Sequence, residues 1–185
     1  MAESKGMFII LACSLLKTKP QAQAAAAVAV KKLTGKSLAE LDPDGWYNTR
    51  VIESVLQSIQ RNSPALLADA AIRFIGHEIY PAVRELGGIP EHLNTPMELL
   101  RFEAEGFIQN HRGENVRPRQ FIEEKNGKVV IEANSPGYNC LLAEGVYTGI
   151  LDMCGVRNGR VMQTKCRQKG HQHCEYTITW EPSSK

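Results

Sequence analysis

The chain has 185 residues, of which 43% are apolar and 23% are charged, and its formal net charge is +2 at pH 7. This length suits one buried core and is too short for two ordinary domains, so we expect a single domain over residues 1–185. The small, scattered positive charge does not indicate a nucleic-acid-binding protein. The five cysteines lack the spacing of a disulfide framework. No apolar run approaches the roughly 20 residues that span a bilayer, and we expect a cytoplasmic protein.

The chain opens with an apolar run over residues 6–16, which periodicity alone cannot assign to a strand or a helix. Residues 10–13 (ILAC) faintly resemble a lipoprotein cleavage box. Because Glu3 precedes this box and apolar residues continue past Cys13, we expect a core element instead. The alanine-rich stretch 21–33 predicts a helix that ends at Gly35.

Three further helices are predicted before residue 111. Asn48 suits an N-cap for a helix with one apolar face, and Pro64 suits the start of the next helix, which Pro81 should kink or end. Thr95 and Glu98 form a capping box for a helix from about residue 96 to 110. Its apolar stripe is interrupted by Glu103.

The last third of the chain predicts two hairpins that flank one helix. Asn126-Gly127 is a strong hairpin signal between the strands 120–124 and 128–133. A helix follows over residues 139–154, with Gly145 and Gly149 spaced for close backbone packing. Alternation then predicts strands on either side of Gly170. The expected class is α+β, with N-terminal helices packed on an antiparallel sheet made of the two hairpins.

Three cysteines should converge in this region. Cys166 ends one predicted strand and Cys174 begins the next, while Cys140 starts the helix. Cys154 lies about 21 Å from Cys140 along a continuous helix, too far to share a site, so we expect a buried apolar thiol there. The other three can be reduced packed thiols, a zinc site, or a redox-active Cys166–Cys174 disulfide.

These features resemble a known family. Cys140, the small-residue helix and the segment 166–180 (CRQKGHQHCEYTITW) are similar to the C-terminal half of the 4-vinyl reductase domain family. Lys5-Gly6-Met7-Phe8 and Trp46-Tyr47 resemble the N-terminal half of its stand-alone bacterial members. The family belongs to a group of ligand-binding folds with haem-NO-binding-associated domains, phenol-responsive sensor domains and TRAPP vesicle-tethering subunits.

The resemblance implies a ligand-binding α+β fold, a strand at Lys5-Gly6-Met7-Phe8, and a homodimer formed through the N-terminal helices. In the phenol-sensor relatives, cysteines matching Cys140, Cys166 and Cys174 hold a structural zinc together with a glutamate. The matching position here is Gln163, and a neutral amide is a poor zinc ligand. His171 or His173 could supply the fourth ligand instead.

A ligand pocket, if present, should be apolar and lie between the helices and the sheet. The candidate lining residues, which are equally suited to the core, are Phe74, Tyr80, Phe102, Phe107, Phe121 and Tyr147. Haem or another tetrapyrrole is a possible cofactor, although the sequence singles out no specific ligand residue for it. We expect His77 at the core or its rim, and His92 and His111 in solvated loops.

The sequence therefore predicts a non-enzymatic sensor or carrier that encloses a small hydrophobic ligand, such as a fatty acyl chain, an aromatic molecule or a tetrapyrrole. It would signal through a dimer or a partner. One alternative is a tetrapyrrole vinyl reductase or its accessory subunit, although the sequence has no dinucleotide fingerprint. Another is a scaffolding subunit without a ligand.

Overall fold

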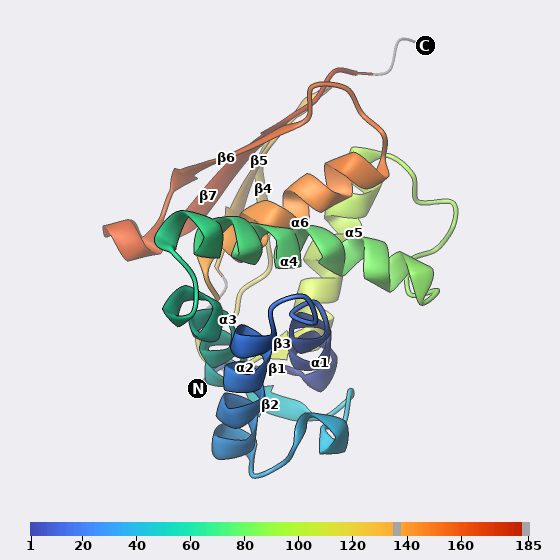
Figure 1. Ribbon diagram of the computed structural model, residues 1–185. Helices are drawn as coiled ribbons and strands as arrows, with labels where there is room; N and C mark the ends of the chain where they lie inside the picture. Colours follow the sequence, from blue (N-terminus) through green and yellow to red (C-terminus); the bar gives the residue numbers. More distant parts are fainter. Residues whose placement is uncertain (135–137, 183–185) are drawn as a thin grey trace.

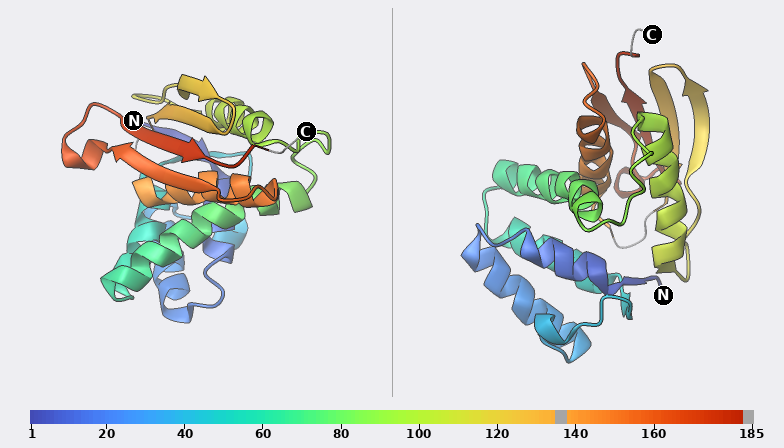
Figure 2. Two further views of the ribbon diagram at one scale, coloured as in Figure 1. Left: turned by 90° about the horizontal axis from the view of Figure 1, so that it is seen from above. Right: turned by 90° about the vertical axis from the view of Figure 1, so that its right-hand side faces the viewer.

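The computed structural model describes residues 1–134 and 138–182 and has its N-terminal helices and its main sheet at opposite ends (Figure 1). Three N-terminal helices form one end. Two further helices, α4 and α6, cross between them and the sheet, and α5 packs beside α6 (Figures 1 and 2). This arrangement confirms the predicted α+β class. The helices are α1 (Gly6–Ser14), α2 (Pro20–Thr34), α3 (Arg50–Arg61), α4 (Ala65–Glu85), α5 (Pro96–Asn110) and α6 (Cys140–Met153).

The main sheet is antiparallel, in the order β4-β5-β7-β6, and consists of the two predicted hairpins. Gly127 has φ +78° in the first hairpin turn, a conformation that glycine adopts without strain. The central strands pair with Ile131 opposite Tyr176, and both side chains are buried. The strands are β4 (Gln120–Lys125), β5 (Lys128–Ala133), β6 (Arg160–Lys165) and β7 (Cys174–Thr179).

A small second sheet ties the N-terminus to the middle of the chain. Strand β1 (Glu3–Lys5) pairs antiparallel with both β2 (Trp46–Asn48) and β3 (His111–Arg112). The strand expected at Lys5-Gly6-Met7-Phe8 is therefore wrong beyond Lys5, because α1 begins at Gly6. The amide groups of Gly6 and Met7 donate to the carbonyl groups of the turn at residues 43–45.

Most predicted helix ends are confirmed. Gly35 caps α2 with a left-handed φ of +73°, and Thr95 and Glu98 form the reciprocal capping box of α5. The N-cap of α3 is Thr49, one residue after the predicted Asn48, although the Asn48 side chain accepts a hydrogen bond from the amide of Arg50 at 2.9 Å. Pro81 does not end its helix, since α4 continues to Glu85.

The closest helix pair is α4 with α6, and glycines make this approach possible. A Cβ at Gly145 would overlap the carbonyl oxygen of Arg73, and one at Gly149 would overlap that of His77. Gly76 on α4 meets the backbone of Leu142 in the same way. The predicted packing role of Gly145 and Gly149 is thus confirmed, with α4 as the partner.

Two hydrophobic clusters form the interior. One joins α1 to α4, and the other joins α5, α6 and the main sheet. Tyr80, Val83 and Val146 pack against both clusters. In the described part of the chain, no helix is both long and apolar enough to cross a membrane.

Candidate functional site

A cavity of about 640 Å³ lies where the two hydrophobic clusters meet. Its walls come from α1, α4, α5 and α6, and most of the lining side chains are apolar. Phe8 and Leu11 cover it from α1, whereas Leu142 and Val146 line it from α6. Its volume falls in the range of pockets that enclose small organic molecules.

Four of the six aromatic residues proposed as pocket lining are found in this cavity: Tyr80, Phe102, Phe107 and Tyr147. Phe74 does not reach it, because its side chain is on the outer side of α4 and is 55% exposed. Phe121 does not line it either. It lies on β4, an edge strand, with the guanidinium of Arg101 5.4 Å from its ring centroid.

A buried ion pair forms part of the cavity wall. Arg119 Nη2 lies 3.0 Å from Glu103 Oε1, and Arg119 Nε lies 3.3 and 3.4 Å from the two carboxylate oxygens. The side chains are only 5% and 7% exposed. The guanidinium also stacks on Phe107, with its Cζ 3.7 Å from the ring centroid. Burial works against the charge of Arg119, but the Glu103 carboxylate outweighs it and raises the arginine pKa.

The sequence indicated one half of this pair. Glu103 interrupts the apolar stripe of α5, and a carboxylate on an inward face needs a cationic partner. The partner, Arg119, lies on the segment before β4 and has no distinctive sequence context.

His111 is buried at the cavity and not solvated in a loop as expected. Its Nδ1 donates to the carbonyl oxygen of Phe107 at 2.8 Å, and its Nε2 accepts from the hydroxyl of Tyr138 at 2.6 Å. The ring stacks on Phe107 with centroids 4.2 Å apart. Burial lowers the pKa of His111 to about 4, so the imidazole is neutral at physiological pH. The prediction failed because β3 pairs with β1 and draws this residue inward.

Two tyrosine hydroxyl groups in the cavity remain protonated. Burial raises the pKa of both Tyr80 and Tyr147, and the nearby Glu103 carboxylate raises it further. Tyr147 is fully buried, and its hydroxyl has no hydrogen-bond partner among the described residues. Among the described residues, the cavity thus has a mostly apolar lining, a compensated ion pair and, in Tyr147, a fully buried hydroxyl without a hydrogen-bond partner.

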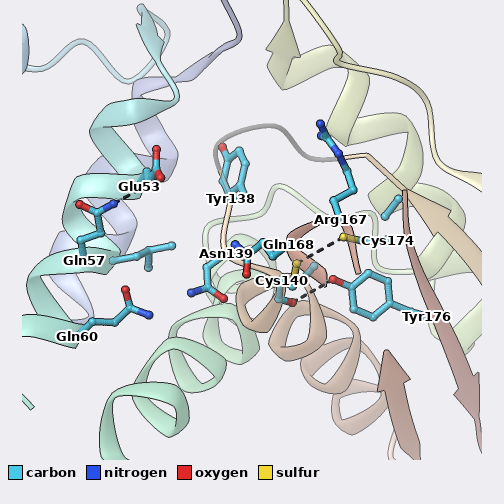
Figure 3. A pocket seen from close by; sticks show the side chains of 13 residues that line it. Glu53, Gln57, Gln60, Tyr138, Asn139, Cys140, Arg167, Gln168, Cys174 and Tyr176 are labelled. Carbon is cyan, nitrogen blue, oxygen red and sulfur yellow. Dashed lines mark hydrogen bonds between the residues drawn. The ribbon is translucent and has the colours of Figure 1, made fainter. Parts of the chain in front are cut away.

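The three cysteines predicted to converge do so, and Figure 3 shows two of them, Cys140 and Cys174. Cys140 Sγ lies 3.5 Å from Cys166 Sγ and 3.4 Å from Cys174 Sγ, and all three sulfur atoms lie within 4.8 Å of one another. Each residue is buried. The hydrogen bond from the Cys140 thiol lowers the pKa of Cys174 to about 7. Thiolates at this spacing are soft metal ligands.

Neither of the two histidines suggested as a fourth ligand belongs to the cluster of close metal-ligating atoms. His171 Nδ1 lies 3.2 Å from the carbonyl oxygen of Cys166, and His173 Nδ1 lies 3.4 Å from Glu132 Oε1. Gln163 donates to the hydroxyl of Tyr176 at 3.3 Å. Cys154 is separate from the cluster, as predicted. Its side chain is half-buried, however, at the last turn of α6.

A second cavity, of about 460 Å³, opens beside Cys140 and Cys174. Figure 3 shows the polar side chains around it, with Glu53 and Gln57 from α3 on one side and Arg167 on the other. The thiol cluster is therefore next to a polar space that water can enter, while the first cavity is apolar.

His77 lies at the rim of the α4–α6 contact, as predicted. Its Nδ1 is 2.7 Å from Glu78 Oε1, and its Nε2 is 2.9 Å from Asp152 Oδ2 on α6. Burial works to lower its pKa, but the two carboxylates outweigh burial and raise it. His92 is exposed. Neither residue lines the apolar cavity.

This architecture matches solved structures of H-NOX, or haem NO-binding, domains. An H-NOX protein from Shewanella oneidensis in the Fe(II)NO state has a TM-score of 0.71 at 14% identity, covering 96% of this chain and 99% of that one. One from K. algicida, in the Fe(II) unliganded state, has a TM-score of 0.67 at 12% identity over 98% of both chains. A structure from work on haem distortion in the H-NOX family reaches 0.73 at 12% identity over 98% and 97%.

The chain has the H-NOX fold. No family model matches the sequence, and a search of the curated proteins found no match. The sequence resemblance placed the chain in a group of folds that includes haem-NO-binding-associated domains, and the similarity to H-NOX structures agrees with that part of the prediction. The resemblance to 4-vinyl reductase domains and to TRAPP subunits stays a prediction. At 11–16% identity the H-NOX likeness carries the fold and nothing about the ligand.

Proposed function

We propose that the protein is a non-enzymatic sensor or carrier domain that encloses a small hydrophobic molecule in the apolar cavity. The observation that carries this proposal is the cavity itself, which is lined by α1 on one side and by α5 and α6 on the other. A guest there contacts both hydrophobic clusters at once. Its binding free energy therefore depends on how the clusters are placed, which is what a ligand-controlled switch requires.

Haem is the first guest to consider, because neighbouring H-NOX structures contain haem iron. Haem iron is held by histidine, cysteine, tyrosine, or methionine together with histidine. The only histidine in the lining, His111, has both ring nitrogens hydrogen-bonded within the described structure. Tyr147 and Tyr80 have raised pKa values, which oppose an iron-bound phenolate. The lining does not fit a haem held through its iron.

The proposed guest is therefore an apolar molecule retained by burial without a bond to a metal. Fatty acyl chains, aromatic molecules and metal-free tetrapyrroles share this property. Burial of apolar area contributes about 25 cal/mol per Å². An apolar guest that fills the cavity of about 640 Å³ therefore needs few polar contacts to remain bound.

Native mass spectrometry of protein purified from its own cells tests this function. We expect a retained small molecule, and we expect Val146→Trp to remove it by filling the cavity. Val28→Trp is the matched control, because Val28 is 69% exposed on α2. The proposal would be contradicted if wild-type protein retained no small molecule, or if Val146→Trp retained the molecule as well as Val28→Trp does. A bound haem with its iron ligated would overturn the ligand class.

The alternative functions predict different results. A tetrapyrrole reductase or its accessory subunit would support NADPH-dependent turnover of a divinyl pigment. A scaffolding subunit would retain no small molecule and would elute with a protein partner. The homodimer also stays a prediction, which light scattering of the purified protein tests directly.

We also propose a zinc site at Cys140, Cys166 and Cys174. Three thiolates at about 2.3 Å from a tetrahedral ion lie about 3.8 Å apart. The observed separations of 3.4 and 3.5 Å need to widen only slightly. The polar cavity beside the cluster has room for a water molecule as fourth ligand.

Metal analysis tests the zinc site. We expect about one zinc per chain in wild-type protein, a loss of zinc in Cys166→Ser, and a lower melting temperature after chelation. Cys154→Ser is the matched control, since Cys154 lies outside the cluster. Wild-type protein without zinc would leave three reduced thiols or a redox pair, which thiol titration under reducing and oxidising conditions separates.

A further inference from the structure

Tyr147 and Tyr176 form a pair of buried tyrosines, of which only Tyr176 has hydrogen-bond partners for its hydroxyl group among the described residues. Their rings pack edge to face, with centroids 5.3 Å apart. The Tyr176 hydroxyl donates to the carbonyl oxygen of Cys140 at 3.0 Å and accepts from Gln163 at 3.3 Å. The Tyr147 hydroxyl has no such partner among the described residues, although Tyr147 is 0% exposed.

A buried hydroxyl without a partner is unfavourable, because it gives up hydrogen bonds to water and receives nothing in return. Tyr147 lines the apolar cavity. A guest in that cavity could therefore supply the hydrogen-bond partner that the protein does not give the Tyr147 hydroxyl. A buried polar group without a partner calls for a specific explanation, and the Tyr147 hydroxyl is the one of the three such groups among the described residues that lines the apolar cavity.

The electrostatic surroundings define which group the guest presents. Burial, and after it the Glu103 carboxylate, raise the pKa of Tyr147, so its hydroxyl stays protonated and is a donor. The Glu103 carboxylate repels any anion that enters the cavity. The Arg119 guanidinium is already hydrogen-bonded to Glu103 through Nε and Nη2. His111 adds no positive charge, because its imidazole is neutral at physiological pH. A neutral acceptor meets none of these penalties.

We propose that the cavity ligand carries an uncharged oxygen acceptor, such as a ketone, ester or amide carbonyl, which accepts a hydrogen bond from the Tyr147 hydroxyl. This inference rests on the proposed function and adds the chemical class of the ligand. The remainder of the ligand is apolar, as the rest of the lining requires.

Three naphthalene probes of matched size test the inference: 2-acetylnaphthalene, 2-ethylnaphthalene and 2-naphthoate. Their affinities for wild-type protein and Tyr147→Phe are measured by fluorescence titration. In wild type we expect the ketone to bind about tenfold more tightly than the hydrocarbon, as one well-placed hydrogen bond would give. In Tyr147→Phe we expect this ratio to fall to about one, and naphthoate to bind most weakly to both proteins.

Infrared spectroscopy gives a second readout that needs no variant. The carbonyl stretch of 2-acetylnaphthalene bound to wild type should lie below its frequency in hexane, because hydrogen bonding weakens the C=O bond. The same band in Tyr147→Phe should return toward the hexane value. Tyr176→Phe is the matched control and should leave both the affinity ratio and the band unchanged, since its hydroxyl is bound elsewhere.

The outcomes separate the two proposals. If none of the three probes binds wild type, the enclosing cavity itself is wrong. If the hydrocarbon binds as tightly as the ketone, or if the carbonyl band is the same in both proteins, the neutral-acceptor inference is overturned while the cavity stands. Preference for naphthoate would show that Arg119 exchanges Glu103 for a ligand anion, which also overturns it.

Discussion

The carbonyl oxygen of His77 on α4 lies against the Cα of Gly149 on α6, in the space that a Cβ would occupy. It is also the carbonyl that an unbroken helix would bond to residue 81, which is proline and has no N–H to donate. Pro81 thus leaves α4 continuous while releasing a backbone oxygen at one of the close contacts between α4 and α6. The two helices that meet here also form one wall of the apolar cavity through Tyr80 and Val146.

Replacing Gly149 with alanine should therefore lower the free energy of unfolding by about 1–3 kcal/mol, because α4 and α6 must separate to admit a methyl group. Gly106→Ala on α5 is the control. A Cβ there has only the Tyr80 hydroxyl nearby, at 3.9 Å, so alanine should be neutral or stabilising by up to about 1 kcal/mol. Urea denaturation measures both. Equal effects would mean that the α4–α6 contact is looser than described.

The buried Glu103–Arg119 pair should be costly to break from one side. Arg119→Met leaves the Glu103 carboxylate buried without its cation, and we expect a loss of about 3–5 kcal/mol in the free energy of unfolding. The double variant Glu103→Leu/Arg119→Met should lose much less than the sum of the single variants. Arg101→Met, which breaks an exposed pair with Glu124, should cost about 1 kcal/mol or less. If the double variant lost as much stability as the two single variants together, Glu103 and Arg119 would not be a coupled buried pair.

The two edge-to-face tyrosines, Tyr147 and Tyr176, should respond differently to loss of the hydroxyl. In ligand-free protein, Tyr147→Phe removes an unpartnered polar atom and should be neutral or stabilising by about 1 kcal/mol. Tyr176→Phe leaves the Cys140 carbonyl without its donor and should destabilise by about 1–2 kcal/mol. Thermal unfolding of both variants, with bound molecules first removed, checks the contrast. A destabilising Tyr147→Phe would point to a hydrogen bond within the protein.

His77 should make stability depend on pH. Its pKa is raised in the folded state, although burial alone would lower it, because Asp152 and Glu78 accept its protons. Stabilisation from a raised pKa is complete below the unfolded value of about 6.5 and is lost as pH rises through the folded value. The melting temperature of His77→Gln should therefore fall below that of wild type most at about pH 6, and least at about pH 8 to 9. The exposed His92→Gln should show no such trend.

Local sequence patterns determined much of this fold, because helix caps, hairpin turns and alternation act over a few residues. The capping box at Thr95 and Glu98 and the hairpin turn at Gly127 illustrate this. The closeness of Cys166 and Cys174 followed from the same patterns, since two strand ends at one hairpin lie near each other, whereas Cys140 joins them through the packing of α6 against the main sheet.

Tertiary structure alone decided the cavity. His111 was expected in solvent, yet pairing of β3 with β1 buries it beside Tyr138. Phe74 and Tyr80 share a helix, but the packing of α6 against one side of α4 turns the first outward and the second inward. Arg119 meets Glu103 across residues that no short-range rule connects. These contacts depend on which faces of distant elements meet, and that is set by burial over the whole chain rather than by any one segment.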